Sequence, residues 1–272
     1  MLTRIITAVV ALLIFIPVLV FSGTVVFPIV MALLSLIAAY EMISCVGMTK
    51  LNGIFVSAIL FAGLAPMVPY LYPENSVHII FALAIVFMIT VFTTVVFGRG
   101  TIDYPFSVSV FTGVFYIGIA FASIVLLRGE GKYLYLLVFI GPWVSDTFAY
   151  FGGRLLGKHK LIPEVSPKKT VEGSVSGIVF TAAAFVLYAF IIKKFFDPDF
   201  AANYVFYAVE GAVVSVISQI GDLIASVIKR RFLKKDYGKI FPGHGGVMDR
   251  FDSVLLTAPV IYIISMLPFF NI

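Results

Sequence analysis

Long apolar runs follow one another along most of this chain of 272 residues. A helix needs about 20 mostly apolar residues to cross the hydrocarbon core of a bilayer. Only 12% of the residues are charged and 61% are hydrophobic, whereas about a quarter of a soluble domain is charged. We therefore predict an all-α polytopic integral membrane protein with about nine transmembrane helices. The predicted spans are residues 5–22, 24–46, 53–72, 77–97, 105–127, 133–152, 171–192, 202–228 and 252–270.

The basic residues divide unevenly between the two sides that nine spans define. All but four of the 19 Lys and Arg residues fall on the side of the N-terminus, Arg4, Lys50 and Arg99 among them. The four on the opposite side are Arg128, Lys132, Lys193 and Lys194. Because basic loops stay in the cytoplasm, we expect a cytoplasmic N-terminus and an outside C-terminus. We expect the protein in the cytoplasmic (inner) membrane.

One polar run, residues 226–252, stands between two apolar segments and reads SVIKRRFLKKDYGKIFPGHGGVMDRFD. It holds seven Lys and Arg, three Asp, one His and four Gly. A second basic loop, residues 152–173, falls on the same predicted side of the membrane. This concentration of charge indicates a charged substrate at the membrane surface. The alternative for the basic residues is an anchor for anionic lipid, and we favour it for Arg231, Lys234 and Lys239.

We single out three acidic residues in otherwise apolar spans, because an intramembrane carboxylate is costly and is a functional candidate by default. They are Asp146, Glu210 and Asp222. On a helix, the face of Asp222 also carries Gln219, Ser226 and Lys229, with Arg230 at its edge. Glu210 faces elsewhere, and we expect a structural role for it, such as a hydrogen bond between helices. An interhelical polar seam is the alternative for the Asp222 stripe.

A glycine-rich turn follows the stripe, with His244 between Gly243 and Gly245. Glycines let backbone N–H groups approach an anion closely, so we interpret His244 as a phosphate contact or a proton donor. Asp249 and Asp222 are predicted to hold Mg²⁺ through carboxylate oxygens. The side chains predicted to neutralise a triphosphate are Lys229, Arg230, Lys235 and Arg250. Positioning and charge neutralisation are what phosphoryl or nucleotidyl transfer requires.

The second basic loop ends in Ser166-Pro167-Lys168-Lys169-Thr170, directly before an apolar span. Hydroxyl groups and lysines at a helix N-terminus suit phosphate oxygens. A plain topogenic loop is the alternative. Neither loop contains the GxxxxGK[ST] motif of Walker-type NTPases, and no His/Cys cluster indicates zinc.

The polar run resembles the signature of the phosphatidate cytidylyltransferases, also called CDP-diacylglycerol synthases. The fixed positions read Ser226-Val-Ile-Lys229-Arg230, Lys235-Asp236, Gly238 and His244-Gly245-Gly246-Val-Met-Asp249-Arg250-Phe-Asp252. Looser family features are Gly221-Asp222, the segment from Asp146 to Arg154, and Ser166-Pro-Lys-Lys-Thr170 with Glu172-Gly173. The resemblance is strong over about residues 140–255, and the N-terminal half resembles the family only as a set of apolar spans.

The resemblance implies transfer of a cytidylyl group from CTP to phosphatidic acid, giving CDP-diacylglycerol and pyrophosphate, with one or two Mg²⁺ ions. Catalytic roles are expected for Asp222, Asp249, Lys229, Arg230 and His244. Substrate-binding roles are expected for Ser226, Lys235, Asp236, Gly245, Gly246, Arg250, Asp252, Ser166, Lys168, Lys169, Thr170 and Gln219. Metal ligation is expected for Asp222, Asp249 and Asp146.

We divide the chain at residue 130. Residues 1–130 are expected to be N-terminal membrane helices for scaffold, lipid contact or dimerisation, and residues 131–272 a membrane catalytic domain with two cytoplasmic basic loops. The sixth, seventh and eighth spans, with the start of the ninth, are predicted to wall a polar cavity.

The expected partners are CTP, phosphatidic acid or a related anionic lipid, and the bilayer. No nucleic acid is expected, and a homodimer is kept as a hypothesis. Two alternatives stay open. One is another CTP-dependent lipid phosphotransferase or kinase. The other is an anionic-solute transporter, which would need related halves.

Overall fold

The computed structural model describes residues 2–48, 52–98 and 103–267, without the side chains of residues 2–5 and 8. Three basic residues used to orient the chain lie outside this description: Lys50, Arg99 and the side chain of Arg4. The orientation of the chain in the membrane therefore stays a prediction.

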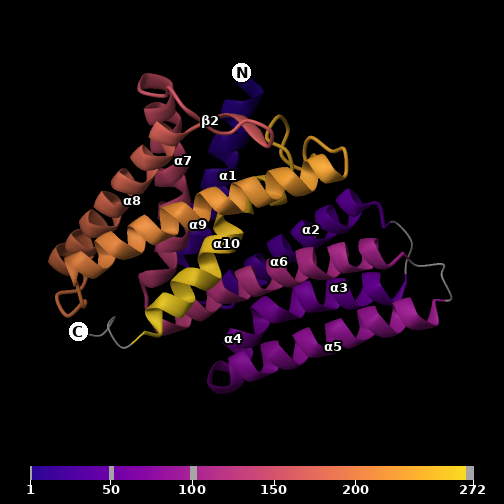
Figure 1. Ribbon diagram of the computed structural model, residues 1–272. Helices are drawn as coiled ribbons and strands as arrows, with labels where there is room; N and C mark the ends of the chain where they lie inside the picture. Colours follow the sequence, from indigo (N-terminus) through magenta and orange to yellow (C-terminus); the bar gives the residue numbers. More distant parts are fainter. Residues whose placement is uncertain (1, 49–51, 99–102, 268–272) are drawn as a thin grey trace. The chain divides into compact units, whose positions relative to one another are not determined.

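Each of the nine predicted spans is helical (Figure 1). In the first half these are α1 (Leu2–Val20), α2 (Val26–Val46), α3 (Gly53–Leu64) with α4 (Val68–Leu71), α5 (Ser76–Phe97) and α6 (Tyr104–Glu130). In the second half they are α7 (Leu137–Leu155), α8 (Val171–Ile191), α9 (Tyr204–Arg231) and α10 (Met248–Ser265). Within the described ranges, seven helices are long and apolar enough to cross a membrane. The prediction of an all-α polytopic membrane protein is confirmed.

Short irregular turns join or extend these helices. The 3₁₀ turns are η1 (Ala65–Met67), η2 (Pro73–Asn75) and η3 (Leu134–Leu136), and a π turn, η4 (Ile192–Phe196), follows α8. Pro66 lies in η1, where the missing N–H and the fixed φ of proline interrupt the regular α-helical pattern.

Three boundaries differ from the sequence prediction and bear on the site. The second basic loop contains an antiparallel hairpin of β1 (Lys160–Ile162) and β2 (Ser166–Thr170). Helix α9 continues to Arg231, so Lys229 and Arg230 lie in its last turn. Helix α10 begins at Met248, so Asp249 lies in its first turn. Lys and Arg are good helix formers, so α9 can continue beyond residue 228, where the predicted apolar span ends.

The chain packs as two compact units. The first unit holds residues 1–130 and 229–251, and the second holds residues 131–228 and 252–272. Most of the polar run thus packs with the helices of the first half of the chain. The division of functions at residue 130 is not tested by this packing and stays a prediction.

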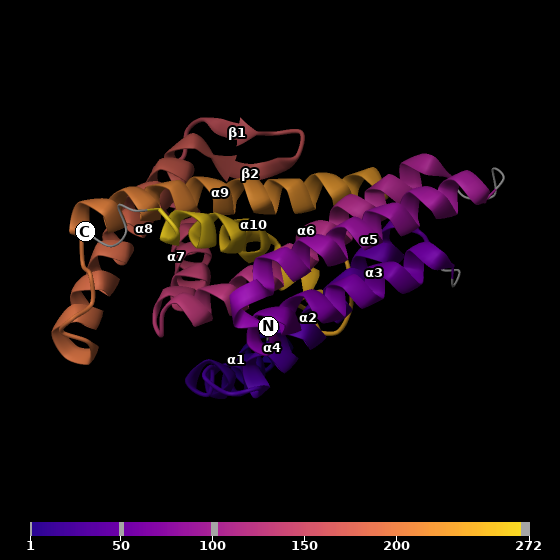
Figure 2. The same ribbon diagram turned by 90° about the horizontal axis from the view of Figure 1, so that it is seen from below.

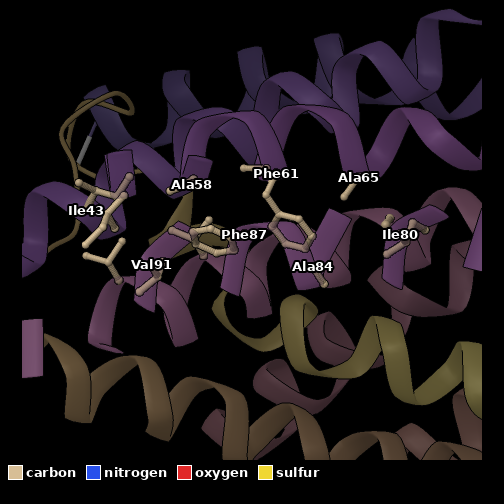
Figure 3. Close-up of a cluster of buried hydrophobic side chains, with 14 of the residues drawn as sticks. Ile43, Ala58, Phe61, Ala65, Ile80, Ala84, Phe87 and Val91 are labelled. Atoms are coloured by element: carbon tan, nitrogen blue, oxygen red, sulfur yellow. The ribbon is translucent and has the colours of Figure 1, made fainter. Parts of the chain in front are cut away.

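In the first unit, α2 packs against α3 and α6, and α3 packs against α5. Buried side chains of these helices form one apolar cluster, which includes Ile43, Phe61 and Phe87 (Figure 3). The rings of Phe61 and Phe87 are stacked with their centroids 5.4 Å apart. Gly118 of α6 makes room for the Phe61 ring, since an added Cβ would lie 2.5 Å from it. Small residues permit such close approach between membrane helices.

In the second unit, α7 packs against α8, and strand β2 contacts both helices (Figure 2). The two helices approach closely at Gly173, where an added Cβ would lie 2.5 Å from the carbonyl oxygen of Ala149 and 3.0 Å from Cα of Gly153. Thr170 caps α8, because its side-chain oxygen accepts a hydrogen bond from the Gly173 N–H at 3.2 Å. The cap fixes the point where the hairpin turns into the helix.

Glu210 lies in α9 and is 2% exposed. Its carboxylate oxygens accept no hydrogen bond from the described residues. The hydrogen bond between helices that we gave as an example of its structural role is therefore not found in the described part of the chain.

We expect Gly173→Ala to lower the midpoint of thermal unfolding of the detergent-solubilised protein. The added methyl group would meet the backbone of α7, and such overpacking typically costs about 1–3 kcal/mol. Gly129→Ala in α6 is the matched control, because its added Cβ would have no described atom within 4 Å apart from its chain neighbours and the backbone of its own helix. Equal midpoints for the two variants would contradict this account of the α7–α8 contact.

Candidate active site

The residues predicted for the site fall in both units. The first unit contains Lys229, Arg230, Lys235, Asp236, His244, Gly245, Gly246, Asp249 and Arg250. The second unit contains Asp146, Ser166, Lys168, Lys169, Thr170, Gln219, Asp222, Ser226 and Asp252.

A polar pocket of about 360 Å³ lies in the second unit. It is walled by α7, the hairpin, the first turn of α8 and the middle of α9, which agrees with the predicted cavity for the sixth, seventh and eighth spans. The polar side chains that line it are Asp146, Tyr150, Arg154, Ser166, Lys168, Lys169, Thr170, Ser174 and Gln219. Three of them are cationic, so the pocket is suited to an anion. Asp252, at the predicted ninth span, is not among its lining residues.

Lys169 forms an ion pair with Asp222 inside the second unit. The Lys169 side chain is 24% exposed and that of Asp222 is 30% exposed. Asp146 lies within electrostatic range of both residues. The structure thus brings together two carboxylates from α7 and α9 and one lysine from the hairpin.

Gln219 belongs to a buried polar seam between helices. Its amide Nε2 donates to the carbonyl oxygen of Ser174 at 3.3 Å and to Oγ of Ser215 at 3.2 Å. Ser215 Oγ is also hydrogen-bonded to Ser145 Oγ at 2.8 Å. For the polar face of α9 that carries Asp222, an interhelical polar seam was the alternative to a substrate site. Gln219 takes part in such a seam, and it also lines the pocket.

His159, to which the sequence assigned no role, fastens the hairpin to α8. Its Nδ1 lies 2.6 Å from a carboxylate oxygen of Glu172, and its backbone N–H donates to the same carboxylate. The backbone N–H of Val171 donates to the His159 carbonyl oxygen at 2.9 Å. These contacts hold the hairpin whose β2 lysines, Lys168 and Lys169, line the pocket.

In the first unit, Asp249 organises the segment between α9 and α10, residues 232–247, which we call the glycine-rich loop. Its Oδ1 accepts a hydrogen bond from Nζ of Lys229 at 2.8 Å. Its Oδ2 accepts hydrogen bonds from the backbone N–H groups of Tyr237, at 2.8 Å, and Gly246, at 3.0 Å. The Asp249 side chain is 4% exposed and that of Lys229 is 15% exposed. Three donors therefore compensate one buried carboxylate.

The middle of the glycine-rich loop is a tight turn from Phe241 to Gly245. The Phe241 N–H donates to the Gly245 carbonyl oxygen at 2.9 Å, and the His244 N–H donates to the Phe241 carbonyl oxygen at 2.8 Å. Gly243 has φ +75° and Gly245 has φ +86°, a region that side chains with a Cβ rarely adopt. Nδ1 of His244 is buried and has no hydrogen-bond partner among the described residues.

The other charged residues that were predicted for the site in the first unit lie at the surface. Arg230, Lys235, Asp236 and Arg250 are exposed. Their side chains form no ion pair with another described residue. Ser226 and Asp252, in the second unit, are half-buried. The exposed Arg230, Lys235 and Arg250 side chains are therefore accessible to a ligand.

Glu41 is a residue that the sequence analysis passed over. It lies in α2, is 4% exposed, and accepts hydrogen bonds from the backbone N–H groups of Val247 at 3.1 Å and Met248 at 2.8 Å. A carboxylate inside an apolar span is costly and marks a candidate site. This criterion, which selected Asp146 and Asp222, would also have selected Glu41.

Asp146 and Asp222 have the chemistry of Mg²⁺ ligands, since both offer carboxylate oxygens. The cationic residues beside them complement the phosphate groups that accompany Mg²⁺ in such sites. Among the described residues, no group of three or more His, Cys, Asp or Glu side chains is close enough to hold a metal. The structure thus supplies a pair of carboxylates in the second unit, and metal binding stays a prediction.

We expect Lys229→Met to lower the stability of the protein by about 3 kcal/mol, because it leaves the buried Asp249 charge without its cationic partner. Thermal or denaturant unfolding in detergent measures the loss. The matched control is Lys239→Met, since Lys239 is exposed and should change stability by less than about 0.5 kcal/mol. A Lys229→Met variant as stable as the control would show that the pair contributes nothing.

Comparison with known proteins places this chain in a family. A sequence model described as the Cytidylyltransferase family matches residues 2–267. The phosphatidate cytidylyltransferase of Staphylococcus haemolyticus is 33% identical over 263 residues, covering 96% of this chain and 97% of that protein. Proteins of the same name from Staphylococcus epidermidis and Staphylococcus aureus are 33% and 32% identical over 267 residues, with the same coverage.

These similarities extend well beyond the polar run and the hairpin, because they include the helices of the N-terminal half. The motifs covered only about residues 140–255, whereas the family model matches residues 2–267. The chain therefore belongs to the cytidylyltransferase family and is a nucleotidyltransferase.

Proposed function

We propose that this chain transfers the cytidylyl group of CTP to phosphatidic acid, forming CDP-diacylglycerol for phospholipid synthesis and releasing pyrophosphate. The observation that carries the proposal is the polar pocket of the second unit, which gathers Arg154, Lys168 and Lys169 in a chain of membrane-spanning helices. A site of this kind suits a lipid whose head group is an anion. The names of the relatives support the same substrates.

The reaction depends more on neutralising the negative charge of the two substrates than on acid–base catalysis. A phosphate oxygen of phosphatidic acid attacks the α-phosphorus of CTP, and the bond from that phosphorus to the bridging oxygen of the β-phosphate breaks. The bonding electrons leave with pyrophosphate. The attacking phosphate is already ionised at neutral pH, so no strong general base is needed. What opposes reaction is repulsion between two polyanions, which cationic side chains at fixed positions offset.

The hairpin and the start of α8 are suited to bind phosphate. Lys168 and Lys169 come from β2, and Arg154 comes from the last turn of α7. The first backbone N–H groups of a helix also favour an anion, and Thr170 marks that end of α8. The Lys169–Asp222 pair keeps the Lys169 ammonium group beside the pocket.

We further propose that Asp146 and Asp222 hold Mg²⁺. When bound there, Mg²⁺ would neutralise phosphate oxygens and polarise the phosphorus that is attacked. The sequence also predicts metal ligation by Asp249, which lies in the first unit. Its Oδ1 accepts the Lys229 hydrogen bond, whereas Oδ2 accepts two backbone donors, so Oδ1 keeps a lone pair for a ligand.

The proposed location is the cytoplasmic membrane, with the active site facing the cytoplasm. The acyl chains of the substrate would stay in the bilayer while its head group reaches the pocket. CTP, which is made in the cytoplasm, would then reach the same side without crossing the membrane.

The decisive experiment supplies purified protein with labelled CTP, phosphatidic acid and Mg²⁺. The expected product is a CDP-lipid, formed together with pyrophosphate. A lipid that carries one additional phosphate, with CDP released, would instead identify a CTP-dependent kinase. The absence of any labelled lipid would overturn the proposal.

We expect Asp222→Asn to lower kcat on the order of a hundredfold or more, because a neutral amide neither holds a cation nor pairs with Lys169. The matched control is Asp199→Asn, since Asp199 is exposed and lies between α8 and α9. Turnover should be measured on variants of equal folded fraction. A near-normal rate for Asp222→Asn would remove this residue from the site.

A further inference from the structure

Glu41 joins the N-terminal helices of the first unit to the glycine-rich loop. Its two carboxylate oxygens are used separately: Oε1 accepts from the Val247 N–H and Oε2 accepts from the Met248 N–H. Both N–H groups lie at the start of α10, where backbone donors lack an intrahelical acceptor. Figure 1 shows the loop beside α2, and 206 and 207 residues separate the bonded positions.

Two glycines of the loop pack directly against the Glu41 carboxylate. A Cβ added at Gly238 or at Gly246 would clash with its oxygens. Neither glycine has a positive φ, so the backbone conformation at these positions would accept alanine. What requires glycine at both positions is the Glu41 carboxylate.

Asp249 binds the backbone next to the two amides that Glu41 holds. Its Oδ2 accepts the Gly246 N–H, and Glu41 accepts the next two N–H groups along the chain. Two buried carboxylates therefore fix consecutive backbone amides of residues 246–248. A shift of this backbone would move Asp249 and, through it, the Lys229 ammonium group.

We propose that Glu41 is a positioning residue for the cytidylyl transfer. It positions Asp249 and Lys229 by binding the backbone N–H groups of Val247 and Met248. It does not itself contact substrate. The inference rests on the proposed function. It assigns to the first half of the chain a part in the reaction beyond scaffold, lipid contact or dimerisation.

The first test replaces Glu41 with glutamine, which has the same shape. Glutamine has one acceptor oxygen, and its NH₂ group would face a backbone N–H, so one hydrogen bond is lost and a donor–donor conflict appears. Loss of charge-assisted bonds of this kind predicts a fall in kcat of about tenfold to a hundredfold. Glu74→Gln is the matched control, because Glu74 is exposed in η2.

The rates must be measured per folded protein, well below the unfolding midpoint of each variant. A residue that only fills space would tolerate glutamine, and kcat of the folded fraction would equal that of Glu74→Gln. A kcat within about twofold of the control would therefore overturn the proposal. Hydrogen exchange of the peptide that contains Val247 and Met248 should be faster in Glu41→Gln, and unchanged exchange would also overturn it.

The second test uses Gly238→Ala, which presses on the Glu41 carboxylate without removing it. We expect a lower kcat in the wild-type background and a smaller loss in the Glu41→Ala background, where the clash is gone. Residues in contact show such non-additivity, whereas independent residues do not. Additive losses, or a wild-type rate for Gly238→Ala, would overturn the proposed contact.

These outcomes are separable from failure of the proposed function. If the wild-type protein forms no CDP-lipid, the proposed reaction is wrong, whereas the hydrogen-exchange comparison still reports whether Glu41 holds the loop. If the wild-type protein is active and the Glu41 variants match their control, the reaction stands and the positioning role is wrong.

Discussion

The hydrogen bonds of Asp249 are the interaction on which the first unit's polar segment depends. One carboxylate draws together the last turn of α9, the glycine-rich loop and the first turn of α10. A buried charge is tolerated when donors compensate it, and here an ammonium group and two backbone amides do so. Glu41 satisfies the next two amides in the same way. Backbone hydrogen bonds are made at the start of the loop, by Leu233 and Lys234, and in the turn at Phe241–Gly245, and the two carboxylates hold the residues from Gly246 to Met248.

In the second unit, specific contacts hold cationic side chains beside apolar helices. The hairpin is fastened by the Thr170 cap and by the contact between His159 and Glu172. Lys169 is then paired with Asp222. This arrangement suits a nucleotidyltransferase, because its substrates carry the negative charge and the protein must supply fixed positive charge. Family membership also decides against the anionic-solute transporter that the composition alone left open.

The helices were predictable because hydropathy acts locally. Each apolar segment of about 20 residues became helical, the third as α3 and α4 joined by a 3₁₀ turn. The motif contained most of the candidate residues. The hairpin was not predicted, since its strands have three and five residues and one contains Pro167. Its pairing depends on the α8 cap and on the backbone bond from Val171 to His159. Glu41 could have been selected as an acidic residue in an apolar span, but its partners could not, because they lie more than 200 residues away.

The sequence by itself determined the membrane class of the protein, the positions of its helices and the residues that resemble the family signature. Those properties follow from side-chain hydropathy and from spacing within one segment. Tertiary structure decided which partner each charge has. Asp222 pairs with Lys169 of the hairpin, and Lys229, seven residues later in the same helix, pairs with Asp249. Glu41 binds amides more than 200 residues away. No local pattern encodes these pairings, because a buried carboxylate binds whichever donors the packing of the helices brings within reach.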